Sequence, residues 1–211
     1  MSSKISLLLA GALISICADV HAGDTKFHVE GDRIIYDTMN VDDPELAEIT
    51  WEDVDDFERL LSENREIRIV ELNSTGGDIG AATYMADLVI DYELDTNVSG
   101  ECASACTLVF LGGERRSINR GSWLGFHQSW WDPEYVERYF LENKDDEGWS
   151  SPFEFASWLY GDTQAEVLTT MQYFVERGVD PLFAIKTMQA TSDDMWYPRR
   201  KELESAGVIV E

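Results

Sequence analysis

The sequence predicts an α/β domain built on a parallel sheet, with an added aromatic-rich helical segment. Short β-branched runs alternate with amphipathic stretches along residues 50–127, which is the pattern of strand–helix–strand units. Glycine pairs follow at Gly76-Gly77 and Gly112-Gly113, where turns are needed. No repeat and no Pro/Gly/Ser-rich linker divides residues 23–211, so we expect a single domain there.

The first 22 residues predict a signal peptide. Lys4 supplies the positive start, an apolar run occupies residues 5–18, and small residues suit cleavage after Ala22. The run of about 14 residues is short for a membrane span, which needs roughly 20; a retained anchor is the alternative. Cys17 does not suit lipid attachment, because the bulky Ile16 precedes it. We therefore expect an exported protein, periplasmic or secreted.

The elements before residue 93 follow from their hydrophobic periods. Alternation about a Gly-Asp turn predicts a hairpin, β-branched residues predict a buried strand, and apolar positions three and four apart predict helices. Thr50 with Asp53 three residues later is typical of a helix start. The expected elements are a hairpin over 27–38, a helix from 51, a strand over 67–72 and a helix over 79–92.

The alternation continues to His127. We expect a strand over 95–99, a helix over 103–111 and a strand over 122–126. Ligands of parallel sheets bind beyond the carboxyl ends of the strands. Gly77, Ser104 and His127 each fall at such an end, so the predicted fold gathers them at one edge.

The composition of the chain changes after residue 129, where aromatic residues become frequent. Ten aromatics occupy residues 130–160, which we interpret as an insertion. They suit packing against the sheet and core, and the alternatives are a substrate-binding lid or an oligomer interface. Further on, we expect a helix from Asp162 through Arg177, another after Asp180-Pro181 and a closing strand over 208–210.

The charge is strongly acidic, with a formal net charge of −25. Removal of the signal leaves it unchanged, because Lys4 and Asp19 are lost together. Such a surface repels nucleic acid and anionic lipid, so neither is an expected partner. No metal-ligand spacing and no phosphate-binding loop occurs, so we expect no metal and no cofactor.

Ser104 and His127 are the candidates for nucleophilic chemistry. A serine attacks only when a base takes its proton, and histidine is best suited to this near neutral pH. After signal cleavage only His28 and His127 remain, and His28 lies in the predicted hairpin, where we expect it at the surface. The Gly-Gly turn suits close backbone approach to a developing oxyanion, and the N–H of Ala105 offers a second donor at a helix start.

Cys102 and Cys106 flank the candidate nucleophile. In an oxidising compartment the pair could form a disulfide, and on a helix their spacing lies near the upper end of what one tolerates. The alternative is two buried thiols, since a free cysteine packs as a small apolar residue. We expect the disulfide.

Residues 72–127 resemble the core of the Clp protease proteolytic subunit, in the Clp/crotonase superfamily. Asn73-Ser-Thr-Gly-Gly resembles that family's Asn-Ser-Pro-Gly-Gly turn, with Thr75 replacing the proline. Gly100 stands four residues before Ser104, as in its Gly-x-x-x-Ser signature, and His127-Gln128 matches its His-Gln. Cys-x-Ser-x-Cys around the serine indicates an exported branch of the superfamily.

The resemblance implies both a fold and a site. The fold would be the Clp/crotonase-like sheet of repeated strand-strand-helix units. Ser104 would be the nucleophile and His127 the base, with Gly77 and Ala105 as oxyanion donors. Relatives form rings through an elongated helical segment, so a homo-oligomer is possible, although the aromatic-rich segment alters that part of the chain.

The third triad residue departs from the family pattern. Aligning Tyr197 with a family aromatic places Thr191 where an aspartate is expected. Asp194 is our candidate, with Asp193 as the alternative, and both could equally be solvated loop acids. Lys186 as the base of a Ser-Lys dyad is a weaker possibility, since it lies in an ordinary helical stretch.

We therefore expect an ATP-independent serine hydrolase, a peptidase acting on peptides or unfolded chains, without an ATPase partner. The alternative is a non-catalytic Clp-like binding protein, because the third triad residue is displaced and two cysteines flank the serine. An acyl-CoA enzyme of the crotonase branch is disfavoured by the predicted export.

Overall fold

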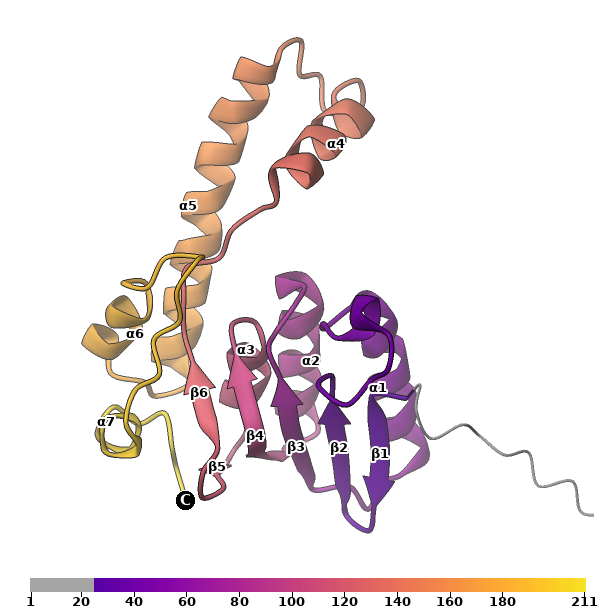
Figure 1. The fold of residues 1–211 in the computed structure, drawn as a ribbon, viewed down its shortest axis with the longest axis vertical. Coiled ribbons are helices and arrows are strands. Elements are labelled where there is room, and N and C mark those ends of the chain that lie inside the picture. The colour runs from indigo at the N-terminus through magenta and orange to yellow at the C-terminus, as the bar shows by residue number, and fades with distance from the viewer. Residues whose placement is uncertain (1–24) are drawn as a thin grey trace, which may run out of the picture.

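A computed structural model describes residues 25–211, and its centre is a six-stranded, mostly parallel sheet (Figure 1). The strands are β1 (Phe27–Glu30), β2 (Arg33–Asp37), β3 (Ile69–Ser74), β4 (Asp95–Ala103), β5 (Arg116–Ile118) and β6 (Trp123–Gly125). Their order is β1-β2-β3-β4-β5, and β6 also pairs with β4, nearer its carboxyl end. Only β1 and β2 pair antiparallel, as the predicted hairpin. The predicted signal peptide lies outside the described residues.

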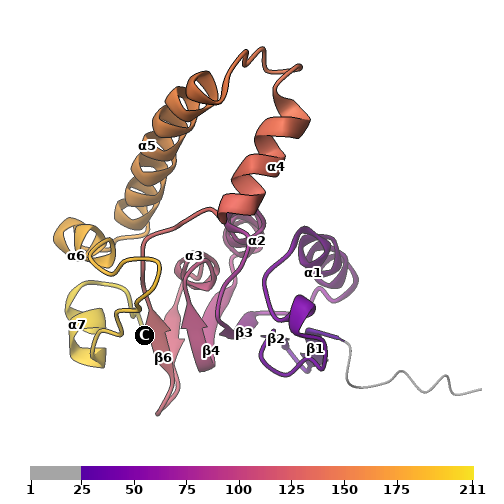
Figure 2. The ribbon, with the colours of Figure 1, turned by 45° about the horizontal axis from the view of Figure 1, so that its top comes forward.

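The helices divide into a layer, an arm and a C-terminal group. They are η1 (Pro44–Leu46), α1 (Trp51–Glu63), α2 (Ile79–Asp91), α3 (Cys106–Leu111), α4 (Pro133–Asn143), α5 (Pro152–Glu176), α6 (Pro181–Thr187) and α7 (Arg200–Ser205). Figures 1 and 2 show α1, α2 and α3 along one face of the sheet, with α4 and α5 extending away from it. Helices α6 and α7 lie beside β6.

The core lies between the sheet and the layer of α1, α2 and α3. Residues on β2 and β3 alternate between buried and half-buried, because only one face of the sheet is covered. Tyr36, Leu72, Phe57, Met85 and Phe110 are among the fully buried side chains of this core. The predicted alternation of strands and helices over residues 50–127 is confirmed.

The start of α1 is fixed by Asp53. Its carboxylate accepts a hydrogen bond from the Thr50 backbone N–H at 2.8 Å, as the sequence pattern predicted. The same buried oxygen also accepts hydrogen bonds from the Tyr36 hydroxyl and the Lys26 ammonium, each at 2.7 Å. One carboxylate therefore joins the helix start to β2 and to the residues before β1.

Several predicted elements differ in the structure. The strand expected over 95–99 continues to Ala103 as β4, so the helix expected from residue 103 begins only at Cys106. The helix expected from Asp162 begins ten residues earlier, at Pro152, because the Ser151 side chain caps it by accepting from the Glu154 N–H. The closing strand over 208–210 is reduced to one bridge between Val210 and Arg116.

The aromatics of residues 130–160 pack mainly on one another in the arm of α4 and α5. Trp149 and Phe155 are buried, with ring centroids 4.8 Å apart, and Tyr139 and Trp158 surround them. Packing against the sheet is therefore not what orders this segment. Among residues 25–211, no helix combines the length and apolar character needed to span a bilayer.

Candidate active site

The carboxyl ends of three neighbouring parallel strands bring the predicted site residues together. Gly76 and Gly77 follow β3, Ser104 follows β4 and His127 follows β6 by two residues. The Ser104 backbone N–H donates to the Gly125 carbonyl at 3.0 Å, which extends the β4–β6 ladder into the turn. The ladder thus sets Ser104 beside the segment that carries His127.

Ser104 and His127 are in hydrogen-bond contact. The Ser104 Oγ lies 2.7 Å from the His127 Nε2. Ser104 has φ of +54°, a left-handed conformation that side chains other than glycine seldom adopt. This sharp turn joins β4 to α3, and such outliers gather at functional sites.

A disulfide joins Cys102 and Cys106 across that turn, and both cysteines are fully buried. Cys102 belongs to β4 and Cys106 is the first residue of α3. The expectation of a bridged pair is therefore borne out in the structure. The link closes a short loop whose middle residue is Ser104, so it restrains the turn that presents the hydroxyl.

The Gly76-Gly77 turn packs against both Ser104 and Ile49. A Cβ on Gly77 would lie 2.3 Å from the Ile49 nitrogen. The Ile49 N–H donates to the Gly76 carbonyl, and the Ile49 carbonyl accepts from the Asp78 N–H. These bonds use the peptide groups on either side of Gly77. Among the described residues, the N–H groups of Gly77 and Ala105 have no acceptor.

The Asn73 side chain occupies the space where a side chain at Gly100, four residues before Ser104, would lie. Its Oδ1 accepts from the Glu101 N–H at 2.9 Å, and its Nδ2 donates to Asp37 at 3.0 Å. A Cβ on Gly100 would lie 2.2 Å from that Oδ1. The β3–β4 register shifts here, so the Asn73 amide fills the irregularity and fixes the end of β4.

The second ring nitrogen of His127 lacks a carboxylate. Nδ1 is buried and has no hydrogen-bond partner among the described residues. The Ser192 backbone lies near enough to raise the pKa of the ring, but it forms no hydrogen bond of ordinary geometry with Nδ1. Asp193 and Asp194 are exposed; the Asp193 carboxylate accepts from Ser192 Oγ and that of Asp194 from the Met195 N–H. The structure therefore does not bring either candidate carboxylate to His127.

Burial lowers the pKa of His127 below its usual value of 6.5, and the Ser192 carbonyl opposes this shift only in part. The imidazole is therefore neutral near pH 7. A neutral ring can accept a proton at Nε2 only if the ring proton sits on Nδ1. The ring would then direct that proton toward Ser192.

Two cavities meet at Ser104 and His127. The smaller, of about 60 Å³, is largely apolar and is lined by both residues together with Leu108, Phe126 and Phe174, among others. The larger is a groove of about 1120 Å³ that runs from residues 48–52 to the start of α4. Glu166 of α5 lines both cavities, and its carboxylate accepts from the Ser129 hydroxyl at 2.7 Å. The candidate nucleophile is thus open to an extended ligand.

The other histidine, His28, and the alternative base, Lys186, both lie away from Ser104. His28 is exposed in the hairpin and faces Glu30 at 3.3 Å, as expected for a surface residue. The Lys186 ammonium binds Glu202 and lies 4.3 Å from the centre of the Trp196 ring, so it is committed away from Ser104. No group of His, Cys, Asp and Glu within residues 25–211 could hold a metal ion.

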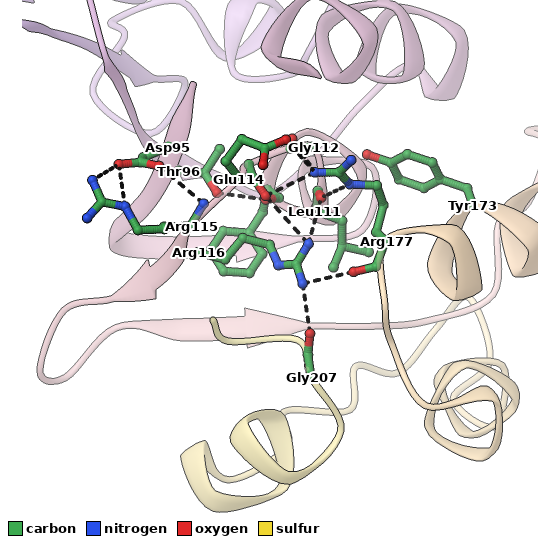
Figure 3. Close-up of polar contacts among 12 residues, drawn as sticks. Asp95, Thr96, Leu111, Gly112, Glu114, Arg115, Arg116, Tyr173, Arg177 and Gly207 are labelled. Atoms are coloured by element: carbon green, nitrogen blue, oxygen red, sulfur yellow. Dashed lines mark hydrogen bonds and ion pairs between the residues drawn. The ribbon is translucent and has the colours of Figure 1, made fainter. Parts of the chain in front are cut away.

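Sequence reasoning missed the arginines that hold α3 from behind. Arg116 is buried, and its guanidinium donates to carbonyls of Leu111, Arg177 and Gly207, as Figure 3 shows. Arg177 donates to the carbonyls of Leu111 and Gly112. These acceptors end α3, where a helix dipole is negative. The helix that begins beside Ser104 is therefore clamped at its other end to α5 and the C-terminal segment.

Comparison with known proteins addresses the fold. No family model matches the sequence, and no curated protein matches it. A point mutant of ClpP1 from Listeria monocytogenes is similar in structure, with a TM-score of 0.54 and 17% identity over 77% of this chain and 84% of that one. The chain has a ClpP-like fold.

A second solved structure resembles the chain more loosely. It is a point mutant of the 1510-N membrane-bound stomatin-specific protease, with a TM-score of 0.48, 17% identity and coverage of 77% of this chain and 73% of that one. The expected Clp/crotonase-like architecture is confirmed by the ClpP1 likeness. At this identity the likeness concerns the ClpP-like fold alone.

Proposed function

We propose that this protein is an exported, ATP-independent serine peptidase that cleaves peptides or unfolded chains. The observation that carries the proposal is the 2.7 Å contact between Ser104 Oγ and His127 Nε2 at the meeting point of two cavities. The ClpP-like fold supports it. Export rests on the residue pattern of the first 22 positions.

In the proposed mechanism Ser104 attacks the scissile carbonyl carbon. Oγ forms the new C–O bond while its proton passes to His127 Nε2. The carbonyl electrons move to the oxygen, which then accepts hydrogen bonds from the free N–H groups of Gly77 and Ala105. His127 returns the proton to the leaving amine, the C–N bond breaks, and water later hydrolyses the acyl-enzyme by the reverse roles.

The first test is labelling with a fluorophosphonate, which reacts with activated serines. We expect one adduct, on Ser104, in the folded wild-type protein. Ser104→Ala should abolish it, and His127→Gln should reduce the labelling rate by roughly 10³-fold or more. Ser117→Ala, which alters a half-buried serine on β5, is the matched control and should label as the wild type does. Absence of any adduct on Ser104 would remove the proposal.

The third triad member remains a proposal of its own. Asp194, or Asp193, would reach His127 only if the exposed turn over 191–194 rearranged when substrate binds. Asp194→Asn and Asp193→Asn distinguish the two arrangements. A fall of roughly 10⁴ in turnover would identify an orienting carboxylate. If turnover changes by less than about threefold in both variants, the catalytic group is the Ser104–His127 pair alone, with the Ser192 backbone next to the imidazole.

A non-catalytic binding protein is the second candidate. The specific observation in its favour is the buried His127 Nδ1, which has no hydrogen-bond partner among residues 25–211. Without an orienting group, serine hydrolases lose most of their turnover. A protein that binds extended peptides in the groove with unlabelled Ser104 would support this reading.

A further inference from the structure

The groove that contains Ser104 is lined by acidic side chains and by no lysine or arginine. The residues that line the groove all lie within residues 25–211, and none of them is a lysine or an arginine. The five acidic residues are Glu48, Glu52, Asp78, Asp132 and Glu166. The first three precede or begin α1 and α2, whereas Asp132 precedes α4 and Glu166 lies on α5.

None of these five carboxylates forms an ion pair with a cation of residues 25–211. Asp78 and Asp132 accept only backbone N–H groups at the starts of α2 and α4, and Glu166 accepts only the Ser129 hydroxyl. The chain compensates carboxylates elsewhere, as in the contact of Arg59 with Asp56. Lys26 acts on Glu52 electrostatically, but its ammonium pairs with the buried Asp53. Most of the negative charge of the groove is therefore left for a ligand to neutralise.

Aromatic rings stand among these carboxylates. Trp51, Trp130, Trp131 and Tyr135 line the groove, and the first two are 53% and 56% exposed. An exposed indole face attracts lysine and arginine side chains through its quadrupole. The chain itself uses such contacts, since Lys186 lies over Trp196 and the Arg138 guanidinium lies 5.4 Å from the centroid of the groove residue Tyr135. Trp51 and Trp130 are the more exposed rings of the groove.

We propose that the substrate is cationic: an extended polypeptide segment rich in lysine and arginine. Its ammonium and guanidinium groups would lie over Trp51 and Trp130 and face the five carboxylates. This inference rests on the proposed function, because it places the substrate at Ser104. The net charge of −25 draws such chains toward the protein, and the groove selects them.

The small pocket limits the size of the side chain that can be placed beside Ser104. Its volume of about 60 Å³ is well below the roughly 150 Å³ that holds a benzene ring. A small apolar side chain such as alanine therefore fits there, between flanking basic residues. The proposed substrates are therefore basic polypeptides that have a small apolar residue at each cleavage point.

Peptide binding to the Ser104→Ala protein tests the inference without turnover. Three fluorescein-labelled peptides of equal length would be compared, built from Lys-Ala, Ser-Ala and Glu-Ala repeats. We expect the Lys-Ala peptide to bind about tenfold or more tightly than the Ser-Ala peptide, with binding weakened by added salt. The Glu-Ala peptide should not bind measurably. Equal affinity for the three peptides would overturn the inference.

A matched pair of variants separates the groove from the overall charge. Glu52→Gln with Asp132→Asn removes two charges from the groove, and asparagine keeps the helix cap of α4. Glu58→Gln with Asp145→Asn removes two exposed charges elsewhere. In the Ser104→Ala background, the groove pair should weaken Lys-Ala binding about tenfold and the control pair less than twofold. Equal effects would show that the groove does not select.

Failure of this inference is distinguishable from failure of the peptidase proposal. Fluorophosphonate labelling of wild-type Ser104 reports only on the nucleophile. Labelling without a preference for the Lys-Ala peptide overturns the cationic substrate alone. A preference for that peptide without labelling supports the cationic ligand and overturns the peptidase.

Discussion

Gly76 and Ser104 meet so closely that a Cβ on Gly76 would lie 2.8 Å from the Cβ of Ser104. The same added atom would lie 2.9 Å from the Ala103 carbonyl oxygen and 3.0 Å from the Ala105 nitrogen. Gly76 also has φ of +107°, which disfavours any side chain. The turn after β3 therefore supports both the nucleophile and one of the proposed oxyanion donors.

Gly76→Ala should destabilise the protein and displace the nucleophile. Backbone strain and overlap with Ser104 together should lower the free energy of unfolding by roughly 2–4 kcal/mol. Gly121→Ala is the matched control, because Gly121 has φ of +88° with open space around it and carries only the backbone cost, about 1–3 kcal/mol. Urea unfolding measures both. Fluorophosphonate labelling of Ser104 should fall for Gly76→Ala and remain for Gly121→Ala; equal labelling would contradict this account.

Acidic solution should abolish the reactivity of Ser104 by protonating His127. Burial lowers the pKa of His127 below 6.5, so more than half of the rings are neutral at pH 6.5 and the ring becomes mainly protonated only in more acidic solution. A protonated ring cannot accept the Ser104 proton. The labelling rate should therefore fall in acid with a midpoint below pH 6.5. His127→Gln should remove this acid limb, and a midpoint at or above 6.5 would contradict the assignment.

Removal of the disulfide should weaken both stability and reactivity. For a loop of this length the chain-entropy relation gives about 2 kcal/mol of unfolding free energy. Cys102→Ala with Cys106→Ala should show this loss in urea unfolding, because alanine leaves no unpaired hydroxyl at these buried positions. The labelling rate of Ser104 should also fall, because its left-handed turn loses a restraint. Reductant should act on the wild type alone; identical labelling with and without it would make the bridge purely structural.

The parts of the fold around the site could be predicted because their signals are local. The β-branched run before Asn73 and the glycine pair after it define β3 and its turn, and the strand carrying His127 follows the same rule. Ser104 and His127 meet because consecutive parallel strands end at one edge. No long-range information was needed to expect this contact.

Other features depend on contacts that the sequence pattern does not reveal. The helix start at Ser151-Pro152 carried a cap signal with Glu154, but the dense aromatics on both sides obscured its apolar period. Ser192 acts on His127 through its backbone carbonyl, a group present at every position. Arg116 lies within a short strand, and its burial depends on acceptors about ninety residues later.

Arg116 and its neighbour Arg115 offer the last test. Arg116 is 3% exposed and donates to several carbonyls that end α3 and the C-terminal segment, whereas Arg115 makes an exposed ion pair with Asp95 (Figure 3). Arg116→Met keeps bulk but leaves buried carbonyls without donors, each costing about 1–3 kcal/mol. Arg115→Met should cost about 0–1 kcal/mol. Urea unfolding should show a clearly lower midpoint for Arg116→Met only, and comparable losses for the two variants would contradict the role of Arg116 as the clamp of α3.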